Sequence, residues 1–198
     1  MHPVISCTAV CSAMLMLGNP DTLVGRGIGQ ADAVNFDAKT MVEFQAKVEK
    51  YAELHRTIAA SLPKVSDSAT PEDIDRRQRE FGRKMAQARA GAKAGDVFSP
   101  SMQAVTRRLM ERLFKNAVSR RELRESVMDD NPSPSQVHVA VNARYPDAVP
   151  LSTMPPEVLK NLPPIPKEVE YRFVGDSLIL LDPDSHIVVD FVSKALPK

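Results

Sequence analysis

The chain has few cysteines, few glycines and no tryptophan, while its prolines number sixteen. Both cysteines, Cys7 and Cys11, lie near the N-terminus, so the rest of the chain uses neither a disulfide nor a thiol. The eight glycines argue against glycine-rich phosphate loops, and the prolines favour stiff connections. No apolar run reaches the roughly eighteen residues that a membrane span needs.

The first 33 residues are predicted to be a signal peptide. Val4–Leu17 is a mostly apolar run, and Ala31–Ala33 has the small-x-small pattern that signal peptidases accept. We therefore expect cleavage after Ala33, a periplasmic or secreted protein, and no transmembrane helix in the mature chain. Lipid anchoring through Cys7, or an N-terminal helix that docks on the domain, are the alternatives.

Residues 34–131 are predicted to be helical. Apolar residues recur at spacings of three and four from Asp37 onward, which predicts an amphipathic helix that ends before Pro63. Thr70, Pro71 and Asp73 form an N-cap signature, so a second helix is expected to begin at Pro71 and pack back on the first as a hairpin. The apolar stripe of the first helix is Met41, Phe44, Val48, Tyr51, Leu54, Ile58 and Leu62, and that of the second is Ile74, Phe81, Met85, Ala88 and Ala92.

Two further helices are expected in this region. Ser99 and Pro100 repeat the cap-then-proline pattern, which predicts a third helix from there. Ser119–Glu122 matches a capping box and predicts a short fourth helix that reaches Met128.

Residues 132–168 are predicted to be a proline-rich strap, and residues 169–198 a β-meander. Nine of the sixteen prolines fall between Pro132 and Pro166, interrupted by an expected edge strand at Val137–Val141 and a helical turn at Glu157–Leu162. In the meander, alternating apolar residues flank two predicted turns, Gly175–Asp176 and Asp182–Ser185. The expected fold class is therefore α+β.

Five polar residues crowd into nine positions of the meander: Asp182, Asp184, Ser185, His186 and Asp190. Aspartates at turns accept hydrogen bonds from nearby backbone N–H groups, and this explains Asp182 and Asp184 without any reactive site. The alternative is an enzyme site between the meander and the helices, in which Asp190 and Arg172 act with Asp182 or His186. On a sheet buried on both faces, Asp190 would need a partner such as Arg172.

We predict no catalytic residue, no cofactor and no metal site, because no sequence motif supports one. The sequence has no Walker loop, no GxGxxG, no GxSxG and no zincin pattern. His55, His138 and His186 are scattered, and His55 is expected on a helix surface beside Glu53 and Arg56. A metal-responsive periplasmic factor, the remaining alternative, would need three such ligands to converge.

Charge is distributed unevenly along the chain. Residues 76–124 hold fourteen Lys and Arg against four Asp and Glu, whereas residues 125–198 carry a net charge of −5. The second and third helices are therefore expected to present a basic face to an anionic envelope component or an acidic protein. Nucleic acid is not expected, because an exported protein rarely meets it and no aromatic residues interleave the basic ones. The predicted binding residues are Arg76, Arg83, Arg107 and Arg112.

Three motifs resemble a family of exported bacterial proteins of unknown activity: GDVFSP at Gly95–Pro100, PLSTMPP at Pro150–Pro156, and EYRFVGDSLILLDPDSHIVVDFVSKALP at Glu170–Pro197. The resemblance covers most of residues 40–198 and implies export, but it brings no activity or site residues. The meander alone also looks like the C-terminal β element of small periplasmic proteins connected with nickel and cobalt homeostasis. We therefore expect an envelope protein that is a non-enzymatic binding or interaction module, with its oligomeric state left open.

Overall fold

The structure, a computed structural model, describes residues 28–66, 68–115 and 117–197. Helices make up the first part of this chain and a three-stranded antiparallel sheet the last, which confirms the α+β fold class. The helices are α1 (Ile28–Ala60), α2 (Pro71–Ala88), α3 (Pro100–Leu113), α4 (Ala117–Met128) and α5 (Pro156–Asn161), and the strands are β1 (Glu170–Val174), β2 (Ser177–Asp182) and β3 (Ile187–Val192).

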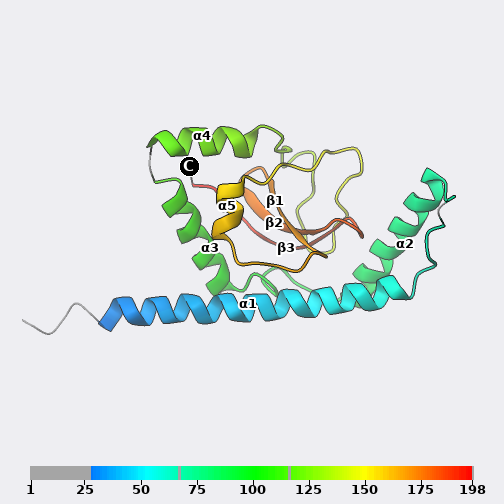
Figure 1. The fold of residues 1–198 in the computed structure, drawn as a ribbon, viewed down its shortest axis with the longest axis horizontal. Coiled ribbons are helices and arrows are strands. Elements are labelled where there is room, and N and C mark those ends of the chain that lie inside the picture. The colour runs from blue at the N-terminus through cyan, green and yellow to red at the C-terminus, as the bar shows by residue number, and fades with distance from the viewer. Residues whose placement is uncertain (1–27, 67, 116, 198) are drawn as a thin grey trace, which may run out of the picture.

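Helix α1 is a long rod along one side of the molecule, and both α2 and α3 contact it (Figure 1). Its predicted stripe is confirmed, since Phe44, Val48 and Tyr51 are buried. The helix begins at Ile28, earlier than expected, and so runs through the predicted cleavage position. Residues 1–27, with Cys7 and the apolar run, lie outside the described residues, and the signal peptide stays a prediction. No helix in the described ranges is both long enough and apolar enough to cross a membrane.

The N-caps of α2 and α3 are confirmed. Thr70 and Asp73 form a reciprocal capping box, and Ser99 accepts a hydrogen bond from the backbone N–H of Met102. The predicted stripe of α2 is only partly right: Phe81 and Met85 are buried, but Ala88 is exposed and Ile74 is 51 % exposed. Ile74 is exposed because α2 slants away from α1, so that only its C-terminal half reaches the core (Figure 1).

The sheet has the order β1-β2-β3 and is buried on both faces. One face packs on the helices through residues such as Tyr171, Leu180 and Val189. The other face, with Ile179 among its buried residues, is covered by the first part of the proline-rich strap, through Val137, Tyr145 and Val149. The predicted two-residue turn is confirmed by the pairing of Val174 with Ser177 and by a φ of 58° at Gly175.

The expected edge strand at Val137–Val141 is wrong. Val137 instead covers the second face of the sheet, and the chain reaches β3 only at Asn142–Tyr145. There Arg144 forms an isolated antiparallel bridge with Ile187, and the N–H of Tyr145 donates to the carbonyl of His186 at 2.7 Å. No backbone hydrogen bond among the described residues joins residues 137–141 to a strand, so this run does not extend the sheet.

Candidate functional site around the β2–β3 turn

Asp182, the last residue of β2, is fully buried and joins the β2–β3 turn to α1. One carboxylate oxygen accepts a hydrogen bond from the hydroxyl of Tyr51 at 2.7 Å and lies 2.8 Å from Nδ1 of His55. The other oxygen accepts from the backbone N–H groups of Asp184 and Ser185, both at 3.0 Å. The predicted turn role of Asp182 is therefore confirmed, and a tie to α1 is added to it.

His55 is buried, so its expected place on the helix surface is wrong. Its ring meets Phe81 edge-on, with the ring centroids 4.8 Å apart. While Nδ1 faces Asp182, Nε2 lies 3.4 Å from a carboxylate oxygen of Asp184. The spacing of Phe44, Val48, Tyr51 and His55 was the signal for burial, because it continues the apolar stripe at helical intervals.

Burial and charge act against each other in this cluster. Burial alone lowers the pKa of His55, but the hydrogen bond and negative charge of Asp182, helped by Asp184 and Glu168, hold that pKa above its ordinary value. Burial raises the pKa of Asp182, yet the hydrogen bonds from His55 and Tyr51 hold it below its usual range. The two shifts favour a buried imidazolium–carboxylate pair. Because both ring nitrogens face carboxylates, the imidazole is a structural link and is not a free base for a substrate.

The cluster also contacts Arg89, the residue at the C-terminal end of α2. The guanidinium of Arg89 lies over the ring of Tyr51, 4.9 Å from its centroid, and donates to the carbonyl of Val189 and to the side chain of Asn142. Burial lowers the pKa of Arg89. Burial also raises the pKa of Tyr51, and the negative charge of Asp182 raises it further. The buried side of the turn thus ties α1, the end of α2 and β3 together.

Asp190 in β3 is also fully buried, but Arg172 is not its partner. Its carboxylate accepts hydrogen bonds from the backbone N–H groups of Gly95, Val97 and Phe98, the last at 2.8 Å, and from that of Phe191. The GDVFSP segment is therefore folded around this carboxylate. Gly95 has a φ of 92°, a conformation that side-chain-bearing residues rarely adopt.

The four residues of the alternative enzyme site are not brought together. Arg172 pairs with Glu170 and caps the carbonyl of Tyr171, both within β1. His186 turns away from Asp182, and its Nδ1 lies 2.9 Å from a carboxylate oxygen of Asp147 in the strap. Each of these groups is occupied by a different part of the fold, so they do not surround one substrate.

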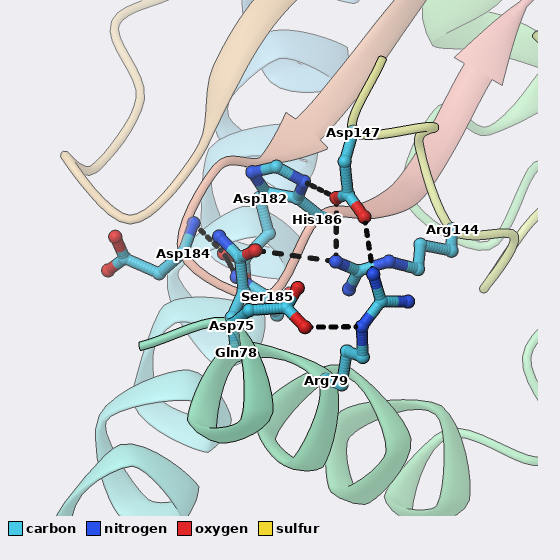
Figure 2. A network of polar contacts seen from close by, with 9 residues as sticks. All are labelled: Asp75, Gln78, Arg79, Arg144, Asp147, Asp182, Asp184, Ser185 and His186. Carbon is cyan, nitrogen blue, oxygen red and sulfur yellow. Dashed lines mark hydrogen bonds and ion pairs between the residues drawn. The ribbon is translucent and has the colours of Figure 1, made fainter. Parts of the chain in front are cut away.

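A second polar cluster lies on the outer side of the turn (Figure 2). The carboxylate of Asp147 forms ion pairs with the guanidinium groups of Arg144, at 2.7 Å, and Arg79, at 2.9 Å, in addition to its contact with the imidazole of His186. Arg79 is also bound to Asp75 at 2.8 Å. Burial raises the pKa of Asp147, but the neighbouring Arg144, His186 and Arg79 hold it below its usual range. The strap is thereby fixed to α2 and to the turn by charged groups.

A pocket of about 300 Å³ opens beside this cluster, between α2 and the turn. Arg83 at its wall is exposed, and the only partner of its side chain among the described residues is Gln87, at 3.3 Å. Two buried donors of lining residues, Nε of Arg144 and the hydroxyl of Ser185, have no hydrogen-bond partner in the described part of the chain. The lining residues are Arg79, Gly82, Arg83, Ala86, Asn142, Arg144, Ser185 and Ile187.

Gly82 sets the distance between the two walls of this pocket. A Cβ at position 82 would lie 2.7 Å from the carbonyl oxygen of Ser185, which is closer than real Cβ contacts. Only glycine therefore lets α2 approach the turn this closely.

The predicted basic residues do not form one continuous surface. Helices α2 and α3 contact different stretches of α1 and lie apart (Figure 1). On α2, Arg76 pairs with Asp73 and Arg83 borders the pocket. On α3, Arg107 donates to the carbonyl of Ser193 at 3.1 Å, whereas Arg112 is exposed and has no side-chain partner among the described residues.

No group of three or more His, Cys, Asp or Glu side chains placed to hold a metal ion occurs within residues 28–66, 68–115 and 117–197. Comparison of the chain with family models, curated proteins and solved structures finds no match. The resemblance of the three motifs to exported bacterial proteins therefore stays a prediction.

Proposed function

We propose that this protein is an exported, non-enzymatic binding module that holds a phosphate or carboxylate group of an envelope partner in the pocket between α2 and the β2–β3 turn. The observation that carries this proposal is the set of three arginines on the pocket wall, of which Arg83 has no carboxylate partner among the described residues. Planar guanidinium groups bind such oxyanions through paired, charge-assisted hydrogen bonds.

The arrangement of the other two arginines supports the same role. Asp147 and Asp75 hold the side chains of Arg79 and Arg144 in place. These two carboxylates do not neutralise all three arginines of the pocket wall. Fixed guanidinium groups lose little conformational entropy when an anion arrives. Asn142 also lines this wall, and its amide is held by Arg89.

Binding is favoured over catalysis because the carboxylates of the meander serve the fold. Asp182 and Asp190 are both fully buried and hydrogen-bonded within the protein, and neither lines the pocket. Export is supported by the apolar N-terminal run and the Ala31–Ala33 pattern alone.

The test compares two exposed arginines at different positions, Arg83 at the pocket and Arg112 on α3. Retention on phosphatidylglycerol vesicles is measured for the wild type, Arg83→Gln and Arg112→Gln at low and high salt, with phosphatidylcholine vesicles as the uncharged reference. We expect Arg83→Gln to lower the affinity about tenfold, because a charge-assisted contact is lost, and Arg112→Gln to bind like the wild type.

Two outcomes would overturn the pocket as the binding site. Equal losses in both variants would indicate a diffuse attraction to a basic surface. Binding that neither variant nor salt weakens would remove the role of arginine altogether, since contacts between exposed charges are screened by salt.

A further inference from the structure

The two edges of the sheet are protected in different ways. The outer edge of β3 is covered by backbone hydrogen bonds from Asn142 and Tyr145. β1 forms the other edge, where Ser152 from the strap both donates to the carbonyl of Phe173 at 3.0 Å and accepts from its N–H at 3.1 Å. Since Phe173 turns its backbone groups away from β2, Tyr171, two residues earlier, must do the same.

The strap forms no such pair of hydrogen bonds with the backbone of Tyr171 among the described residues. The carbonyl of Tyr171 accepts a hydrogen bond at 3.0 Å from Nη1 of Arg172, a side chain that is itself 22 % exposed. Its N–H has no partner among the described residues. Further along, the N–H of Gly175 is bound by the carbonyl of Pro132 and the side chain of Asn131. The strap thus closes the β1 edge at Phe173, and only the side chain of Arg172 covers it at Tyr171.

A pocket of about 560 Å³ lies beside this open position. Leu159 is 49 % exposed at its wall, so the pocket offers an apolar surface to solvent. Its charges are Lys160, Glu170 and Arg172, and the single carboxylate is already paired with Arg172. Lys160 has no side-chain partner in the described ranges, and Nε of Arg172 is buried and unpartnered. The wall is therefore apolar with an excess of positive charge.

We propose that a short extended segment of an acidic partner protein adds to β1 at Tyr171. The partner strand would replace the guanidinium of Arg172 on the carbonyl of Tyr171 and would accept from the free N–H, as in other cases of strand addition. An apolar side chain of the segment would enter the pocket beside Leu159. A carboxylate of the segment would pair with the displaced Arg172 and with Lys160.

This site is separate from the arginine pocket at the β2–β3 turn, so either proposal can fail without the other. The displacement of Arg172 is a required step, because its guanidinium occupies the carbonyl of Tyr171, the acceptor that the partner strand needs. Positively charged side chains commonly protect sheet edges from non-specific pairing. Here the same side chain would select a partner that carries a carboxylate.

The experiment uses the full, ¹⁵N-labelled chain and capped five-residue peptides of alternating valine and threonine with one aspartate. We expect the aspartate peptide to slow hydrogen exchange of the Tyr171 amide and to leave that of Phe173, already bonded to Ser152, unchanged. A matched asparagine peptide should bind about tenfold more weakly. A version N-methylated at the central amide should not protect Tyr171, because its main-chain donor is lost.

A pair of variants separates the role of Arg172 from general attraction. Arg172→Gln should reduce the preference for the aspartate peptide, because only Lys160 remains to pair with the carboxylate, while Lys167→Gln, which changes a neighbouring exposed lysine, should keep the full difference. Absence of any change at the Tyr171 amide at millimolar peptide would overturn the proposal. So would equal binding of the two peptides to the wild-type protein.

Discussion

Asp182 and Asp190 are both fully buried in the β2–β3 hairpin, but they are held by different kinds of donor. Asp190 is surrounded by backbone N–H groups, three of them from the loop between α2 and α3. Asp182 receives two backbone N–H groups and two side chains of α1, one of which, His55, titrates. The comparison teaches that one meander can fasten one segment through backbone donors alone and another through a side chain, His55, that itself titrates.

The largest effect is expected at Asp190. Replacing it in Asp190→Ala leaves several buried N–H groups without an acceptor, and we expect a loss of about 3–5 kcal/mol in the free energy of unfolding. Urea unfolding followed by circular dichroism measures it. Asp129→Ala, at an exposed aspartate without a side-chain partner among the described residues, is the matched control and should change stability by less than about 0.5 kcal/mol. A comparable loss in both variants would contradict the importance of the buried carboxylate.

Asp182→Asn should rank second. The amide keeps the shape of the side chain but removes the negative charge beside His55, so we expect a loss of about 3 kcal/mol at pH 6 by the same urea assay. The double variant Asp182→Asn with His55→Gln should recover part of that loss, because the unpaired imidazolium is gone. Strictly additive losses would show that the two side chains do not act as a pair.

Tyr51→Phe tests the neutral donor of the same carboxylate. The aromatic ring and its contact with Arg89 remain, and one hydrogen bond of 2.7 Å to Asp182 is lost. We expect a cost of about 1–2 kcal/mol in urea unfolding, less than for Asp182→Asn. A loss as large as that of Asp182→Asn would mean that the hydroxyl, and not His55, holds α1 to the turn.

The smallest effect is expected in the pH dependence of stability, which should differ between the link made by Asp182 and the link made by Asp190. The pKa of His55 is raised in the folded state, so its contribution is fully present below the unfolded value of about 6.5 and is lost as pH rises through the folded pKa. The pKa of Asp182 is lowered, so its contribution is present above the unfolded value of about 3.9 and is lost as pH falls through the folded pKa.

Urea midpoints across this range provide the measurement. Wild-type protein should lose stability as pH rises above about 6.5, and His55→Gln should lack that loss. Above about pH 6.5, where His55 loses its proton, the Asp190→Ala variant should keep the wild-type slope, because the donors to Asp190 are backbone N–H groups and do not include His55. An unchanged slope in His55→Gln would assign the pH dependence to another group.

Much of the helical part could be predicted because its signals are local. The N-caps at Thr70 and Ser99 depend on residues within one turn of each other, and the structure confirms both. Ile74 was misplaced because helical periodicity describes one helix and not the angle at which it meets its neighbour. Val137 was misplaced for a similar reason, since a short β-branched run fits a strand or a cover for a sheet equally well.

The candidate site depended more strongly on contacts between distant residues. Asp182 and His55 are separated by 127 positions, and Asp190 meets residues more than 90 positions earlier. No local pattern links a carboxylate at a strand end to a histidine on the first helix. The stripe through Phe44, Val48 and Tyr51 could have indicated that His55 is buried, but not which group neutralises it.

The sequence by itself determined where α2 and α3 begin and where β1 turns into β2, because caps, prolines and hairpin glycines act on neighbouring backbone. It also determined that the basic residues concentrate in residues 76–124. Only the tertiary structure decided which of those arginines are used internally and which border a pocket, and it alone brought Asp182 to α1 and Asp190 to the GDVFSP loop. A buried carboxylate must be hydrogen-bonded by whichever donors the fold places next to it. Those donors come from residues far away in the sequence, so the local sequence does not identify them.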